Sequence, residues 1–224
     1  MVVAIHQPNY IPYIGLFYKI MESDVFVFLD DAQFSKGNVH ERNIVKSMKG
    51  ECRLKIPVEY RFGDSIMKVR TKDELNWKEK HLKTVEDNYR LSEHFDEVYD
   101  MFSGLIEKDY SNLAEMNIAI ITEICKRLEF GTKFVRSSQL DVSGAKEERV
   151  IAICEKLGAS EYISGNGARV YQEEEHFTSR GIKLTYSRYK PFEYPQLWSN
   201  GFLPNASILD YLFNCGFTTD RFEV

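Results

Sequence analysis

The sequence predicts an α/β protein with a Rossmann-like, mainly parallel sheet, helices on both faces and a helical insertion. Two apolar runs near the N-terminus, 2–5 and 25–29, enclose an amphipathic segment, which is the strand–helix–strand pattern of such a sheet. The same alternation returns after residue 133, whereas the middle of the chain has helical periodicity. We therefore expect a single α/β domain over 1–224, with 76–130 as a helical subdomain.

Apolar periodicity and helix-end signals predict the remaining elements. A capping box precedes one helix, because Ser111 or Asn112 is followed by Glu115, and Ser143 and Gly158 bracket another. Helices are expected within 76–107 and at 113–128, 145–157, 170–178 and 208–213. Strands are expected at 53–57, 66–71, 133–136, 161–164 and 182–186.

Composition narrows the class of protein. A hydrophobic fraction of 43% indicates a folded core, and a net charge of -5 gives no support for a nucleic-acid surface. The four cysteines form no CxxC pair and no metal-ligand cluster, which is typical of reduced thiols in a cytoplasmic protein. No apolar run approaches the ~20 residues of a membrane span, and no basic segment precedes the first apolar run as in a signal peptide. A homodimer is the default oligomer.

The loop after the first apolar run is the first candidate site. It holds His6, Gln7, Asn9 and Tyr10, with Tyr13 at the start of the next helix. In open α/β sheets, ligands bind beyond the carboxyl ends of strands, often against the next helix. The alternative is a core histidine with turn-forming Asn and Pro. So many polar and aromatic side chains in one short loop favour a site.

A charged segment follows the second apolar run. Asp30 and Asp31 stand at the strand end, where a carboxylate pair can hold Mg²⁺ together with substrate phosphates. Lys36, Arg42 and Lys46 would then neutralise phosphate oxygens. Gln33 and Asn43 are the further polar candidates here. The alternative is a solvated, turn-forming loop.

A third candidate is the small-residue loop after the strand at 161–164. Ser164, Gly165 and Asn166 leave backbone N–H groups available to an anion, and Arg169 follows them. A plain glycine turn explains the same residues.

The C-terminal part supplies a fourth candidate. Tyr194 and Gln196 suit a small-molecule pocket or a sugar platform, and equally a closing loop packed on the core. Trp77 and His81 share one helical face, and we interpret them as structural. The sequence contains no GxSxG, HExxH or EF-hand motif, so an enzyme would act by positioning and electrostatics on an activated substrate.

Several segments together resemble the WbqC-like family over essentially the whole chain. They are HQPNYIPYIGLFYKI, SDVFVFLDDAQFSKGN, HERNIVKS, SSQLDVSGAKEERVIAICEKLGASEYISGNGARVY and GFLPNASILDYLFNCG. That family is associated with gene clusters for O-antigen and other surface glycans, and a glycine transferase role has been proposed for members. The resemblance carries over as motif residues His6, Gln7, Asn9, Tyr10, Asp30, Asp31, Gln33, Arg42 and Asn43.

The order of the first elements is also similar to that of adenylyl-transferring α/β enzymes, including pantoate-β-alanine ligases. Their HxGH tetrad is replaced here by Tyr-Ile-Pro-Tyr at 10–13, which leaves His6 as the nearby imidazole. This similarity implies ATP and Mg²⁺ as cofactors, with Mg²⁺-ATP at Asp30 or Asp31 and the phosphates near Lys36 and Arg42. His6 would accept a proton or contact a phosphate.

Together the two resemblances imply acyl or aminoacyl transfer to an amino sugar in surface polysaccharide biosynthesis, with glycine as one donor, through an acyl adenylate. The expected partners are small molecules: an amino acid, an amino sugar or a nucleotide sugar. Three alternatives stay open: transfer from a preformed donor such as a thioester, nucleotidyl transfer to a sugar phosphate, and a non-catalytic glycan-assembly protein.

Overall fold

The chain folds into two units whose segments alternate along the sequence. The computed structural model describes residues 1–222. Unit 1 consists of Met1–Gln7, Gly15–Asp31 and Phe130–Tyr189, and unit 2 of Pro8–Ile14, Ala32–Glu129 and Lys190–Val224. Residues 76–129 of the subdomain expected at 76–130 fall in unit 2, which also contains the preceding segment from Ala32, whereas Phe130 and the segment after it belong to unit 1.

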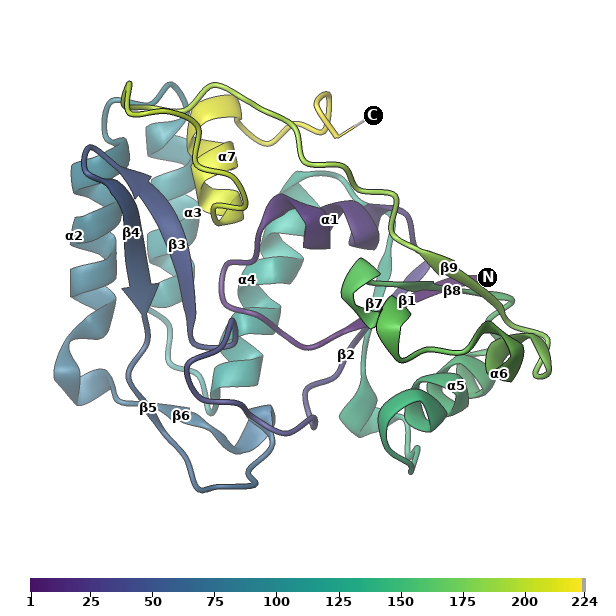
Figure 1. Ribbon diagram of the computed structural model, residues 1–224. Helices are drawn as coiled ribbons and strands as arrows, with labels where there is room; N and C mark the ends of the chain where they lie inside the picture. The colour runs from purple at the N-terminus through teal and green to yellow at the C-terminus, as the bar shows by residue number, and fades with distance from the viewer. Residues whose placement is uncertain (223–224) are drawn as a thin grey trace. The chain divides into compact units, whose positions relative to one another are not determined.

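Unit 1 contains a five-stranded sheet in which every neighbouring pair is parallel (Figure 1). Its strand order is β7-β2-β1-β8-β9. The strands are β1 (Val2–His6), β2 (Val25–Phe28), β7 (Lys133–Arg136), β8 (Glu161–Ser164) and β9 (Lys183–Tyr186). β2 is buried along its whole length, as expected for a strand whose sequence is apolar throughout rather than alternating. The Rossmann-like fold class is confirmed.

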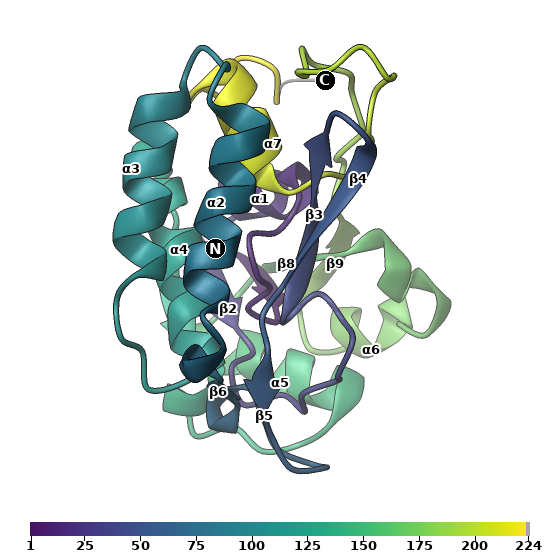
Figure 2. The ribbon, with the colours of Figure 1, turned by 90° about the vertical axis from the view of Figure 1, so that its left-hand side faces the viewer.

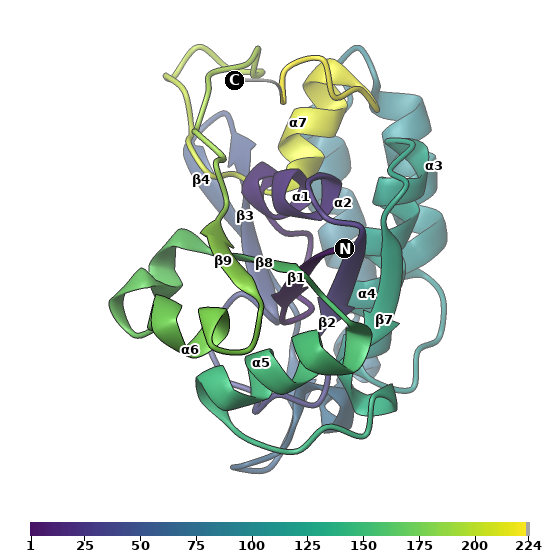
Figure 3. The ribbon, with the colours of Figure 1, turned by 90° about the vertical axis from the view of Figure 1, so that its right-hand side faces the viewer.

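Helices cover both faces of this sheet (Figure 3). One face buries Val3 and Val27 in a common core with Ile153 of α5 (Lys146–Leu157) and with Phe177 of α6 (Glu174–Thr178). On the opposite face lies α1 (Ile14–Met21), which places the ammonium of Lys19 5.9 Å from the ring centroid of Phe26.

Unit 2 is mainly helical, with an antiparallel hairpin (Figure 2). α2 (Trp77–Tyr89) packs against α3 (Phe95–Ile106), and α3 also contacts α4 (Leu113–Arg127) and α7 (Ile208–Cys215). The hairpin is formed by β3 (Arg42–Ser47) and β4 (Gly50–Lys55), and β5 (Val58–Glu59) pairs with β6 (Arg70–Thr71).

Helix-end signals in the sequence predicted several boundaries correctly. The side chain of the N-cap residue Asn112 accepts a 3.0 Å bond from the Glu115 amide, and the Glu115 carboxylate accepts one from the amide of Ser111, the residue before the N-cap. α5 ends at Gly158, whose φ of 69° lies in the left-handed region that favours glycine. Ser143 does not cap α5, because the N-cap residue is Ala145.

Two predictions of secondary structure were wrong, and a segment for which a loop was the alternative interpretation is a strand. The strand expected at 66–71 is a 3₁₀ turn, η1 (Ile66–Lys68), followed only by the short β6. The polar helix near 170–178 divides into η4 (Asn166–Val170) and α6. The polar segment that contains Arg42, Asn43 and Lys46 is the strand β3 and not a loop. In the last case pairing with β4 overrides the local pattern.

The remaining 3₁₀ turns are η2 (Asp73–Leu75) and η3 (Ser137–Gln139). All four cysteines are free. Across residues 1–222, no helix combines the length and the apolar character needed to cross a membrane.

Candidate functional site

The strand order of unit 1 reverses next to β1. The chain runs from β1 to β2 and then β7 on one side, and β8 and β9 lie on the other side of β1. At such a reversal the connections leave in opposite directions, so a crevice opens beyond the carboxyl ends of the two central strands, and ligands bind there. In unit 1 this position lies between the ends of β1 and β8, and we call it the switch point.

His6 and Gln7 stand at the switch point because β1 ends there. Both residues are half-buried, and Nδ1 of His6 lies 2.9 Å from the carbonyl oxygen of Gln7. A carbonyl only accepts, so Nδ1 donates this bond, which fixes the imidazole at this edge of the sheet.

The segment after β8 forms the other side of the switch point. Ser164 is buried at the strand end, Gly165 follows it, and Asn166 begins η4. The amide of Asn166 donates a 3.1 Å bond to the carbonyl of Ser187, which follows β9. Arg169 is exposed, and its guanidinium lies 4.4 Å from the ring centroid of Tyr186. A cation is therefore held at the same edge as His6.

Asp30, two residues beyond Phe28 at the end of β2, is only 1% exposed. Its carboxylate accepts hydrogen bonds from the amide and hydroxyl of Ser138, at 3.1 Å and 2.8 Å, and lies 3.3 Å from the Ser137 hydroxyl. These bonds tie the end of β2 to the turn η3 after β7. The geometry gives Asp30 a structural role in joining neighbouring strand ends.

Asp31 is half-buried and accepts from the Ser137 hydroxyl and from the guanidinium of Arg149 on α5. Donors within unit 1 thus engage both carboxylates. Within the described part of the chain, no group of three or more His, Cys, Asp or Glu residues is arranged to hold a metal ion. The role of Asp31 with Mg²⁺ stays a prediction.

The rest of the N-terminal loop belongs to unit 2. Asn9 is 6% exposed and Tyr10 is fully buried, whereas Tyr13 is 40% exposed and forms an isolated β-bridge with Ser207. Ile11 has a φ of 37°, a conformation that strains a β-branched residue. Strain of this kind persists only where the surroundings hold the backbone in place.

Asn43 of β3 holds that strained backbone. Its amide donates to the carbonyls of Tyr10 and Ile11, at 3.2 Å and 2.8 Å. The structure therefore uses Asn43, a predicted substrate-binding residue, to fix the loop. Arg42, on the same strand, is half-buried.

Two other predicted residues of unit 2 lie on its surface. Gln33 is exposed and forms a β-bridge with Ser65. Lys36 is exposed, with its ammonium 5.8 Å from the ring centroid of Tyr60.

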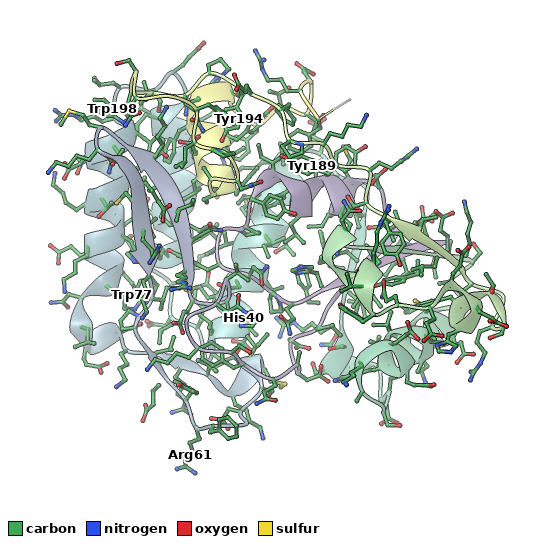
Figure 4. The ribbon with its side chains drawn as sticks, viewed as in Figure 1. His40, Arg61, Trp77, Tyr189, Tyr194 and Trp198 are labelled. Carbon is green, nitrogen blue, oxygen red and sulfur yellow. The ribbon has the colours of Figure 1, made fainter. Side chains whose placement is uncertain are left out.

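The C-terminal candidates converge on a buried carboxylate, that of Asp210 in α7. It accepts from the hydroxyls of Tyr89, at 2.5 Å, and Tyr194, at 2.8 Å, and from the Gln196 amide at 2.6 Å. Burial raises the pKa of Asp210, and these donors oppose that rise. Figure 4 shows Tyr194 beside α7. This geometry is that of a closing loop packed on the core.

Lys46 binds the backbone of the same C-terminal loop. Its ammonium donates to the carbonyls of Trp198, at 3.0 Å, and Gly201, at 2.6 Å. Lys46 itself is 3% exposed. The side chain thus serves unit 2 as a cross-link between β3 and the C-terminal loop.

Sequence reasoning overlooked Lys19, Ser137, Ser138, Arg149 and Asn117. Asn117 donates from α4 to the carbonyls of Pro8 and His40, at 3.0 Å and 2.9 Å. A signal existed for Lys19 and Asn117, since each is a polar residue on an otherwise apolar helical stripe. Nothing in the sequence indicates that Ser137 and Arg149 meet Asp31.

The fold and the switch point define a Rossmann-like α/β protein with a polar site at the carboxyl edge of its sheet. The chain belongs to the WbqC-like protein family, whose sequence profile matches residues 7–221. It is 35% identical over 218 residues to the uncharacterized protein Rv1507c of Mycobacterium tuberculosis, an alignment that covers 96% of this chain and 94% of the relative. No solved structure matches the chain.

Proposed function

We propose that this protein transfers an acyl or aminoacyl group, with glycine as one donor, to the amine of a sugar in surface polysaccharide biosynthesis, through an acyl adenylate made from ATP. The observation that carries this proposal is the switch point of unit 1, where His6 ends β1 and a small-residue loop with Arg169 follows β8. A polar crevice at this position suits a nucleotide or an activated acid.

The proposed reaction has two steps. A carboxylate oxygen of the acid attacks the α-phosphorus of ATP, and pyrophosphate leaves. The amine of the sugar then attacks the acyl carbon, the amide C–N bond forms, the C–O bond to the phosphate breaks, and AMP leaves with the bonding electrons. We assign to His6 the acceptance of the proton that the amine loses, because its imidazole stands at the carboxyl end of β1, at the switch point.

Pyrophosphate release tests the proposal directly. Purified protein receives Mg²⁺-ATP and a panel of amino acids and simple acids, with and without UDP-linked amino sugars. Release that depends on one acid and increases with one amine supports the proposal and names both substrates. If no compound of the panel causes pyrophosphate release and calorimetry detects no ATP binding, the proposal is contradicted.

Two histidine variants make the test specific to the site. His6→Ala removes the proposed proton acceptor, and His176→Ala removes an exposed imidazole on α6 of the same unit. We expect His6→Ala to lose about 10²-fold or more in amide formation, with an unchanged circular dichroism spectrum, and His176→Ala to keep its activity. Equal activity of the two variants contradicts the role of His6.

Transfer from a preformed donor is the second candidate function. The observation that favours it is that the carboxylates of Asp30 and Asp31 accept hydrogen bonds from side chains of unit 1, namely those of Ser137, Ser138 and Arg149. A thioester donor requires no metal-binding carboxylate, so this arrangement suits it. This candidate predicts amide formation from an acyl thioester and an amino sugar in the absence of ATP. A nucleotidyltransferase would instead release pyrophosphate with a sugar phosphate and without an amine.

A further inference from the structure

Lys19 is a buried lysine with almost no compensation for its charge. The residue is 3% exposed, and its ammonium donates one hydrogen bond, 3.0 Å long, to the carbonyl of Ile5. The ammonium also lies over the ring of Phe26, with the ring centroid 5.9 Å away. No carboxylate within residues 1–222 forms an ion pair with it. An ammonium has three donors, so Lys19 is under-satisfied.

The acceptor of that bond lies at the switch point. The carbonyls of Val2 and His6 point toward β2, since they accept from Asp24 and Leu29, whereas the Met1 carbonyl accepts from Ser160, which precedes β8. Carbonyls alternate sides along a strand, so the carbonyl of Ile5 faces β8. Lys19 reaches this carbonyl from α1.

The pairing of β1 with β8 stops just before this point. Its last pair is Ala4 with Ile163, one residue short of Ile5. The carbonyl of Ile5 accepts from Lys19 in place of continuing that ladder. The ammonium therefore marks the place where the two central strands part, which is where the crevice of a doubly wound sheet begins.

Lys19 also lies on the same face of the sheet as the side chain of His6. Val3 and Ile5 face the core shared with α5, so the alternating residues Ala4 and His6 face α1, which carries Lys19. One helix side chain thus brings a positive charge to the strand end that carries the imidazole.

A structural role alone is a poor explanation of this lysine. A methionine fills a similar volume without the free energy needed to desolvate an ammonium, and buried charges without partners destabilise proteins. Burial lowers the pKa of Lys19 to about 7. Groups with this combination of burial and perturbed titration gather at functional sites.

We propose that Lys19 is the anion-binding group of the switch point and contacts a phosphate oxygen of the substrate bound at the carboxyl ends of β1 and β8. This inference deepens the proposed function, on whose choice of site it rests. Arg169 on the other side of the crevice supplies the exposed cation, and Lys19 the buried one. A phosphate would complete the hydrogen bonds of the ammonium and supply its missing counter-ion.

Calorimetric binding of inorganic pyrophosphate and of AMP near pH 7 tests the assignment, with glycine as a carboxylate control. The variants are Lys19→Met, which keeps the volume without the charge, and Lys156→Met, which removes an exposed lysine of α5 in the same unit. We expect the wild type and Lys156→Met to bind a phosphate probe, and Lys19→Met to bind it about tenfold more weakly or worse.

Proton uptake on binding is a second measurement, and Lys19→Met would leave it unchanged if the role of Lys19 were only structural. An anion beside Lys19 favours its charged form, so binding near pH 7 takes up a proton, which appears as a binding enthalpy that depends on the buffer's ionisation enthalpy. Lys19→Met should abolish this dependence. Equal affinity and equal proton uptake in Lys19→Met, or no phosphate binding by the wild type, overturns the proposal. Binding of glycine alone would assign Lys19 to a carboxylate and overturns it as well.

The same variants separate this inference from the proposed function. If Lys19-dependent phosphate binding occurs without acid-dependent pyrophosphate release, the anion site stands and acyl adenylation fails. If Lys19→Met releases pyrophosphate as fast as the wild type, acyl adenylation stands and the assignment of Lys19 fails.

Discussion

The hydroxyl of Tyr10 donates a 2.9 Å hydrogen bond to Nδ1 of His81, and Nε2 of His81 lies 3.1 Å from the carbonyl of Lys55. The Lys55 carbonyl only accepts, so the proton is on Nε2, and Nδ1 must accept from Tyr10. One neutral imidazole thereby connects the N-terminal loop, β4 and α2 within unit 2. The structural interpretation of His81 agrees with this geometry.

Removal of the Tyr10 hydroxyl should destabilise the protein. Tyr10→Phe leaves Nδ1 of His81 as a buried acceptor without its donor, at a cost of about 1–3 kcal/mol in the free energy of unfolding. Urea denaturation measures this change. Tyr171→Phe, which removes an exposed hydroxyl, should have an unfolding midpoint close to that of the wild type. Equal midpoints for the two variants would show that the bond contributes nothing.

Acid should weaken the fold in a defined range of pH. Burial lowers the pKa of His81 to about 4, from 6.5, and that of His40 likewise to about 4. Between these values the unfolded chain binds protons that the folded chain does not, so stability is full above about pH 6.5 and falls as the pH decreases toward about 4. Unfolding free energies measured across this range should fall less steeply in His81→Gln. An identical slope in both proteins would contradict the shift at His81.

The burial of Lys19 should also make the free energy of unfolding rise with pH, in this case over the alkaline range. Its pKa is lowered from 10.5 to about 7, so between these values the unfolded state holds a proton that the folded state has released, and stability rises as the pH increases from about 7 to about 10.5. Lys19→Met should lose this rise and should be more stable than the wild type near pH 7, by on the order of 1–4 kcal/mol. Thermal unfolding at several pH values measures both effects. Lower stability of the variant near pH 7 would show that the ammonium stabilises the fold.

The carboxylate of Asp210 should be essential for the stability of unit 2. Asp210→Ala leaves the hydroxyls of Tyr89 and Tyr194 as buried donors without their acceptor, and we expect a loss of about 2–5 kcal/mol in unfolding free energy. Chemical denaturation measures the loss, with Asp109→Ala as the control because its side chain is fully exposed. A small effect, similar to that of the control, would mean that the two hydroxyls find other acceptors.

Sequence reasoning predicted best the elements whose signals are local. The apolar run of β2 and the capping box before α4 need no distant partner, and both lie where the pattern indicated. β3 was missed because its residues, Arg-Asn-Ile-Val-Lys-Ser, lack a polar–apolar alternation, and its turn at Met48 and Lys49 lacks a glycine pair. The pairing with β4 is what makes that segment a strand.

For the candidate site, the sequence likewise predicted where residues lie at strand ends but not which groups they contact. The position of His6 and Gln7 at a strand end follows from the apolar run before them, and the structure has them there. The roles of Asn43 and Gln196 did not follow, because their partners are the carbonyls of Tyr10 and Ile11 in one case and the carboxylate of Asp210 in the other. A polar residue in a sequence gives no indication of which buried group it satisfies.

The sequence by itself determined that the first strand ends in an imidazole and that a parallel α/β sheet forms, since both depend on patterns a few residues long. Only the tertiary structure decided that β8 lies beside β1, some 160 positions away, and that Lys19 bonds the carbonyl where the two strands part. The physical reason is that strand order and buried hydrogen bonds join residues distant in sequence. Such pairings are selected by the packing of the whole unit, whereas local periodicity selects only the type of element.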